Sequence, residues 1–150
     1  MSKIETVLVA IDGSPASIAA SEEAIDLAAR LSARLIVISV VSPPELMAPG
    51  AIWPGTVAAA REEAEGITRR IVDQARRAGV EATFLTFEGQ PGEAIVQAAD
   101  AEGADMVVVG AHGRMVVGRL LLGSVSEYLV RHARVPVLVV HPTEAHVAGI

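Results

Sequence analysis

The sequence predicts an α/β fold: a doubly wound, open, five-stranded parallel sheet with helices on both faces, of the Rossmann-like type. The first observation behind this prediction is that short apolar, β-branched runs alternate with alanine-rich, charged stretches along the chain. The second is that several of these runs are continuously apolar, as strands buried on both faces are. A chain of 150 residues can bury its own core, so residues 1–150 are expected to form a single domain.

The expected strands and helices alternate in order along the chain. After a strand at residues 6–11, Ser14 is the expected helix cap and Pro15 the first helical residue, where a missing amide proton is tolerated. After the next strand and a Pro- and Gly-containing loop, the second helix ends near Gly79. The buried stripe of this second helix is Ala60, Ala64, Ile67, Ile71 and Ala75. The remaining elements are strands at 35–41, 81–87, 105–109 and 135–140, and helices at about 91–101 and around 127–131.

Residues suited to a sheet edge predict the order of the strands. The third strand mixes Thr83 and Thr86 with apolar residues, which suits an edge. The fifth contains Pro136, which has no amide proton to donate to a neighbouring strand. The expected order is therefore 3-2-1-4-5, with the topological switch point between strands one and four. Ligands bind at the carboxyl ends there, which are Asp12-Gly13 and Gly110-Ala111.

Composition excludes several classes of protein. Hydrophobic residues make up 51% of the chain and mean hydropathy is +0.45, yet no apolar run approaches the ~18 residues of a membrane span. The net charge of −6 argues against nonspecific nucleic-acid binding. The absence of cysteine and of room for a signal peptide before the first strand fits a cytoplasmic protein. Lys3 is the only lysine, so a P-loop lysine motif is excluded.

Spaced glycines after the fourth strand are the most informative feature. Gly110 closes the apolar run, Gly113 follows after two residues, and after nine more Gly123-Ser124 opens the last helix. Glycine lets the main chain approach a ligand closely, and the unpaired amides at a helix N-terminus favour an anion. The segment therefore predicts a phosphate held between the end of a strand and the start of a helix.

The pattern Gly110-x2-Gly113-x9-Gly123-Ser124 resembles the nucleotide-binding signature of the universal stress protein family, of the ATP-binding type. Residues 9–14 resemble the first strand and turn of that family, residues 89–95 its third-helix entrance, and residues 135–140 its last strand. Four blocks in the expected order make the resemblance specific, and they extend over nearly the whole chain.

The resemblance implies ATP as the ligand, with Mg or Mn as its metal. Asp12 and the main chain of Ala10 and Ile11 would lie beside ribose and adenine, and the Asp12 carboxylate could help hold the metal. Val40 would meet adenine through its main chain. The residues that would line phosphate and ribose are Gly110, Gly113, Arg114, Gly123, Ser124, Val125 and Ser126.

Two of these residues also have purely structural interpretations. Ser124 and Glu127 form the S-x-x-E pattern of a capping box, so the Ser124 hydroxyl either caps its own helix or meets phosphate, or does both. Asp12 either contacts the nucleotide or is a turn residue that binds its own backbone.

Several functions remain open at this point. The first is a cytoplasmic stress-response or regulatory protein that binds ATP. Others are a slow ATPase or phosphotransferase, and a dimeric interaction module that binds a cyclic nucleotide or none. Catalysis needs a positioned base, and no acidic residue has an evident place near the terminal phosphate. We therefore assign no catalytic residue and expect at most slow ATP hydrolysis.

The fifth strand predicts a homodimer. It begins with Val135, ends with Val140 and is apolar, with only Pro136 to blunt an expected edge. An exposed edge of this kind pairs readily with another chain, and twofold antiparallel pairing would bury it. The family resemblance implies the same mode of dimerisation.

Overall fold

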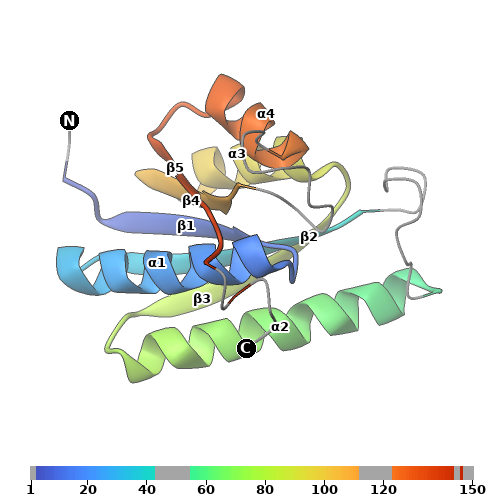
Figure 1. The fold of residues 1–150 in the computed structure, drawn as a ribbon, viewed down its shortest axis with the longest axis horizontal. Helices are drawn as coiled ribbons and strands as arrows, with labels where there is room; N and C mark the ends of the chain where they lie inside the picture. The colour runs from blue at the N-terminus through green and yellow to red at the C-terminus, as the bar shows by residue number, and fades with distance from the viewer. Residues whose placement is uncertain (1–2, 43–54, 112–122, 144–145, 147–150) are drawn as a thin grey trace.

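The computed structural model describes residues 3–42, 55–111, 123–143 and 146, which form a sheet between two layers of helices (Figure 1). The elements in chain order are β1 (Thr6–Ile11), α1 (Pro15–Leu31), β2 (Arg34–Val41), α2 (Val57–Arg77), β3 (Ala82–Glu88), α3 (Pro91–Glu102), β4 (Met106–Gly110), α4 (Ser124–His132) and β5 (Val137–Val140). The predicted alternation of strands and helices is confirmed.

The sheet has five parallel strands in the order β3-β2-β1-β4-β5, which confirms the predicted order. All six residues of the central strand β1 are buried. The strand that contains Thr83 and Thr86 and the strand that follows Pro136 are the two edges. The switch point falls between β1 and β4, where Val7 pairs with Met106 and Val9 with Val108.

The bounds of β1 are as predicted, and those of the other four strands differ from the predicted ones by one or two residues. The largest difference is at β5, which begins at Val137 rather than Val135. Pro136 has no amide proton, but its carbonyl accepts a hydrogen bond from the Val107 amide at 3.0 Å. Pairing with β4 therefore starts at the carbonyl of Pro136, and the regular strand begins one residue later, at Val137.

The core consists of one apolar cluster on each face of the sheet. Successive residues of a strand point to opposite faces, so Val7 and Val9 pack on the side of α1 and α2, whereas Leu8 packs on the side of α3 and α4. Figure 1 shows α1 and α2 together on one side of the sheet and α3 and α4 on the other. Alanines such as Ala24 in α1 are fully buried and let the helices approach the sheet closely.

Helix α1 begins as the sequence predicts. The Ser14 hydroxyl accepts a hydrogen bond from the Ser17 amide at 3.2 Å, and Pro15 is the first helical residue. At its other end Ser32 has the left-handed φ of 53°, and its amide donates to Ala29 at 3.4 Å. The chain then turns directly into β2, which fixes α1 against the middle of the sheet.

Helices α3 and α4 pack at Gly92. A Cβ atom added to Gly92 would lie 2.5 Å from Cδ1 and 2.7 Å from Cγ of Tyr128. The Tyr128 ring also packs against His132, with ring centroids 4.3 Å apart. The aromatic side chain therefore occupies the space that a larger residue in α3 would need.

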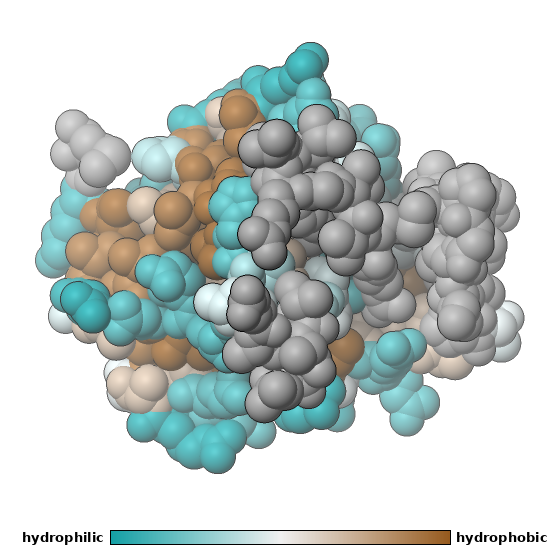
Figure 2. Space-filling view, in the orientation of Figure 1, coloured by the Kyte–Doolittle hydropathy of each residue, from teal (hydrophilic) through white to brown (hydrophobic). Residues whose placement is uncertain are grey.

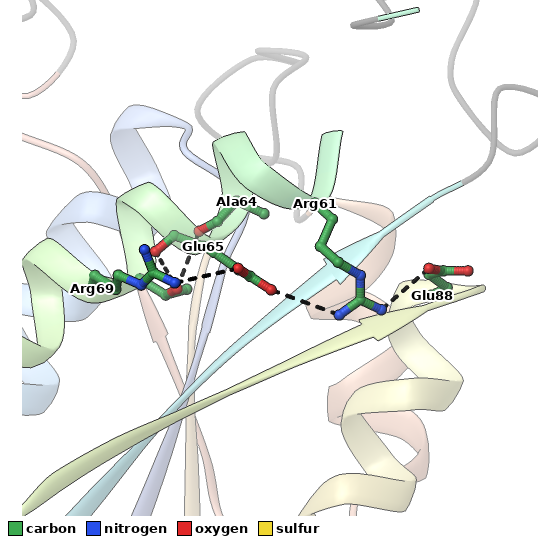
Figure 3. Close-up of polar contacts among 6 residues, drawn as sticks. Arg61, Ala64, Glu65, Arg69 and Glu88 are labelled. Atoms are coloured by element: carbon green, nitrogen blue, oxygen red, sulfur yellow. Dashed lines mark hydrogen bonds and ion pairs between the residues drawn. The ribbon is translucent and has the colours of Figure 1, made fainter. Parts of the chain in front are cut away.

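Charged side chains join α2 to the edge strand β3. Figure 3 shows Arg61 between two carboxylates, 3.2 Å from Glu88 and 3.8 Å from Glu65, with Arg69 on the other side of Glu65 at 3.6 Å. Exposed pairs of this kind each contribute at most about 1 kcal/mol, so they orient the helix more than they stabilise it.

In the described ranges no helix is both long and apolar enough to cross a membrane.

Candidate nucleotide site at the carboxyl edge of the sheet

The chain makes a tight turn directly after β1. Asp12 Oδ1 accepts a hydrogen bond from the Ser14 amide at 2.8 Å, and the Asp12 amide donates to Ser17 Oγ at 3.3 Å. Gly13 lies between them with a φ of 84°, which favours glycine. The interpretation of Asp12 as a turn residue is thus confirmed, while its contact with a nucleotide stays a prediction.

The end of β4 packs directly on the start of α1. A Cβ atom added to Gly110 would lie 2.6 Å from the backbone carbon of Ala16 and 2.8 Å from its oxygen. Gly110 therefore lacks a side chain for a packing reason that the sequence alone does not reveal. The paired strands β1 and β4 therefore both end against the start of α1, because the turn at Asp12 leads into the same helix.

The first turn of α4 lies beside the end of β4. The Gly123 amide donates to the Ala111 carbonyl, and the Ala111 amide donates to Val140 at 2.8 Å. The first bond within the helix joins the Glu127 amide to the Gly123 carbonyl at 2.9 Å. The preceding amides of Ser124, Val125 and Ser126 thus have no partner within the helix, and the positive end of the helix dipole lies at this edge of the sheet.

The helix cap differs from the predicted capping box. Gly123 is the N-cap residue, and no side chain caps this helix end within the described part of the chain. Ser124 is the first helical residue and is exposed. The interpretation of Ser124 and Glu127 as a capping box is therefore wrong, because the helix begins one residue earlier than that pattern requires. The Ser124 hydroxyl is left at the surface of the helix end.

Ser126 has a different environment from Ser124. Its side chain is 1% exposed, and its Oγ lies 3.0 Å from the Ala111 carbonyl and 2.9 Å from the Gly123 carbonyl. The hydroxyl hydrogen is therefore directed at the protein backbone. Of the two serines predicted to line phosphate, only Ser124 presents its side chain to solvent.

The predicted adenine-side residues lie at the carboxyl ends of the central strands. Ala10 and Ile11 are buried and contribute side chains to opposite core clusters, so only their main chain is available to a ligand. Val40 is half-buried and pairs in register with Phe87 of the edge strand. These positions share one edge of the sheet with Asp12 and Gly110, as parallel strands require.

Two predicted phosphate contacts, Gly113 and Arg114, lie outside the described residues, as does most of the loop at 43–55. The sequence places Ala111 at this edge of the sheet but assigns it no role, because its contribution is a peptide group, for which an alanine side chain gives no signal. The role of Ser17 in the turn after β1 was also missed. Ser17 lies three residues after the N-cap Ser14, and that spacing is a detectable signal for its contacts with the turn. Within the described ranges no group of three or more acidic, histidine or cysteine side chains is arranged to hold a metal ion.

A parallel sheet in this order, with a glycine turn and a helix N-terminus at its switch point, defines a Rossmann-like α/β protein. The model of the universal stress protein family matches residues 3–141. The chain belongs to the universal stress protein family, as its glycine spacing predicts.

Curated relatives agree with this family. The chain is 32% identical over 136 residues to a universal stress protein of Methanocaldococcus jannaschii, covering 89% of this chain and 80% of the relative. It is 35% identical over 146 residues to one from Thermus aquaticus, covering 91% and 98%. Against a Mycobacterium tuberculosis relative, 36% identical over 135 residues, the match covers 89% of this chain but only 44% of the longer protein.

Solved structures share the fold. The universal stress protein UspA from Lactobacillus plantarum is similar with a TM-score of 0.81 and 26% identity, covering 93% of this chain and 99% of that one. A universal stress protein in complex with cAMP is similar with a TM-score of 0.73 and 30% identity, and the match covers 95% of this chain and 100% of that chain.

Proposed function

We propose that this protein is a cytoplasmic regulatory protein of the stress response that binds ATP in one domain. The observation that carries the proposal is the N-terminus of α4, which follows a glycine and lies beside the end of β4, and whose first amides have no partner within the helix. Backbone amides and a helix dipole are suited to a phosphate group. A chain with a net charge of −6 needs such a local site to hold a polyanion.

A related protein supports an adenine nucleotide as the ligand. The universal stress protein of known structure that is 30% identical to this chain is in complex with cAMP, which combines adenine, ribose and phosphate. ATP contains the same parts with a longer phosphate chain. The spacing of the glycines after β4 favours the triphosphate of ATP, because glycines on both sides of the loop would let main-chain amides approach a longer phosphate group closely.

The predicted site residues have distinct roles in this proposal. Gly113 and Arg114 would contact the phosphates together with Gly110, Gly123, Ser124 and Val125. The main chain of Ala10, Ile11 and Val40 would contact adenine. Mg or Mn would arrive with the phosphates, since the described residues offer no ready metal cluster, and Asp12 is positioned at the end of β1 to act as an additional ligand.

Isothermal titration calorimetry of the purified chain with ATP tests the proposal. We expect one site per chain with a micromolar dissociation constant, which corresponds to about −8 kcal/mol, and tighter binding with Mg²⁺. Asp12→Asn keeps an oxygen for the Ser14 amide and should remove only the gain from Mg²⁺. Absence of binding by ATP and by other adenine nucleotides would refute the proposal, whereas tighter binding of cAMP than of ATP would identify a cyclic nucleotide as the ligand.

The β5 edge supports a homodimer as part of the proposal. Figure 2 shows apolar surface where Figure 1 draws β5, and all four of its residues are half-buried. The carbonyls of Pro136 and Val140 accept hydrogen bonds from Val107 of β4 and from Ala111, which directly follows β4. Because successive residues alternate in direction, Val139 presents its main chain to the open side of the sheet, where a second copy could pair with it.

Replacing Val139 by lysine is expected to convert a dimer into a monomer at micromolar concentration, because a charged side chain beside the paired edges would be buried without a partner. Light scattering measures the change. Val130→Lys, at a residue that is 53% exposed on α4, is the matched control and should leave the dimer intact. Val139→Pro removes an outward amide and is the second test; a dimer that persists in both folded variants would place the interface elsewhere.

A further inference from the structure

The Ser126 hydroxyl joins two segments that are distant in the sequence. Its single hydrogen is shared between the carbonyl of Ala111, which follows β4, and the carbonyl of Gly123, which precedes α4. The Gly123 amide donates to the same Ala111 carbonyl. The two segments on either side of the candidate phosphate site are therefore held together by a small cluster of bonds with Ser126 at its centre.

Both carbonyls have other partners. The Ala111 carbonyl accepts from the Gly123 amide, and the Gly123 carbonyl accepts from the Glu127 amide at 2.9 Å. Removal of the Ser126 hydroxyl would thus leave neither carbonyl without a hydrogen bond, and the large penalty for a buried unpaired group does not arise. The hydroxyl is not needed to satisfy these groups; what it adds is a link between the end of the strand and the start of the helix.

The same hydroxyl is unsuited to bind a ligand directly. Its side chain is 1% exposed and its single hydrogen is directed at backbone carbonyls. A phosphate oxygen accepts hydrogen bonds and would need that hydrogen. Ser126 therefore differs from Ser124, whose side chain is exposed at the same helix end.

We propose that Ser126 is a positioning residue, which fixes the N-terminus of α4 against the end of β4 so that amides of both segments reach one nucleotide phosphate group. This inference rests on the proposed function. Preorganised donors bind more tightly than donors that must be ordered when the ligand arrives. The Ala111 peptide also connects this cluster to β5, because its amide donates to the Val140 carbonyl at 2.8 Å.

The test compares Ser126→Ala with Ser21→Ala. Ser21 is also 1% exposed and donates to a carbonyl of its own helix, that of Ile18, at 2.6 Å. Both variants lose one buried hydroxyl, but only Ser126→Ala loses a link between two elements. We expect Ser126→Ala to weaken ATP binding in calorimetry by about fivefold to tenfold, the effect of one hydrogen bond, and Ser21→Ala to leave it within about twofold of the parent.

Amide hydrogen exchange provides the second measurement. The Gly123 amide should lose protection in Ser126→Ala and keep it in Ser21→Ala. If Ser126→Ala does not fold, Ser126→Cys, which has a similar volume and a weak donor, should show the same selective loss of ATP affinity. Unchanged ATP binding in a folded Ser126 variant, or an equal loss in Ser21→Ala, would overturn the inference. Failure of the parent protein to bind any nucleotide would instead overturn the proposed function.

Discussion

Replacement of Gly123 by valine is expected to reduce ATP affinity at least a hundredfold. Gly123 has φ −67° and ψ 163°, a conformation that any residue adopts, so the backbone does not require glycine there. A Cβ with two methyl groups would instead occupy the space next to the first amides of α4, where we propose that phosphate binds. Calorimetry with ATP measures the effect.

The fold should tolerate this change well enough for the result to be interpreted. Valine is a poorer N-cap than glycine, which predicts a stability loss of about 1 kcal/mol. Gly66→Val is the matched control: Gly66 lies in α2, and a Cβ atom added there has no neighbour within 4 Å. It should bind ATP like the parent. Parental affinity in a folded Gly123→Val variant would mean that phosphate lies elsewhere.

Gly110→Ala is expected to lower the free energy of unfolding by about 3 kcal/mol, near the upper end of the range for an overpacked core. The added Cβ would lie 2.6 Å from the backbone carbon and 2.8 Å from the Cβ and the oxygen of Ala16. Backbone atoms cannot move aside by a change of rotamer as a long side chain can, so α1 would have to shift away from β4. Urea denaturation monitored by circular dichroism measures the loss.

Gly66→Ala again supplies the comparison. The new methyl group meets open space in the middle of an exposed helical turn, so it should raise the free energy of unfolding by about 0.5–1 kcal/mol. Opposite signs for the two glycine-to-alanine changes are the expected outcome. Equal stability of Gly110→Ala and the parent would show that the contact with Ala16 relaxes without a penalty.

The strand order could be predicted from the sequence because its determinants are local. Thr83 and Thr86 mark one partly solvated strand, and Pro136 lacks the donor that an interior strand needs; both strands are edges in the structure. The position of the candidate site follows from this order, since the switch point brings the ends of β1 and β4 together. The start of α1 could likewise be predicted from local residues, because Ser14 suits the N-cap position and Pro15 the first helical position.

The features that escaped prediction depend on contacts between distant residues. Gly110 lacks a side chain because Ala16 lies against it, and nothing within the glycine motif indicates that neighbour. The capping box failed at Ser124 because the start of α4 is set by the bond from Gly123 to Ala111, which shifts the cap by one residue. A four-residue pattern contains no information about such a tertiary bond.

The contact between Gly92 and Tyr128 limits how the molecule can respond to a ligand. The Tyr128 ring fills the place of a side chain at Gly92, so a movement of α4 toward α3 would press the ring against the backbone of α3. We therefore expect a tilt of α4 toward α3 to displace both helices. A signal that starts beside β4 would thereby reach the segment that leaves β3, on the opposite margin of the sheet.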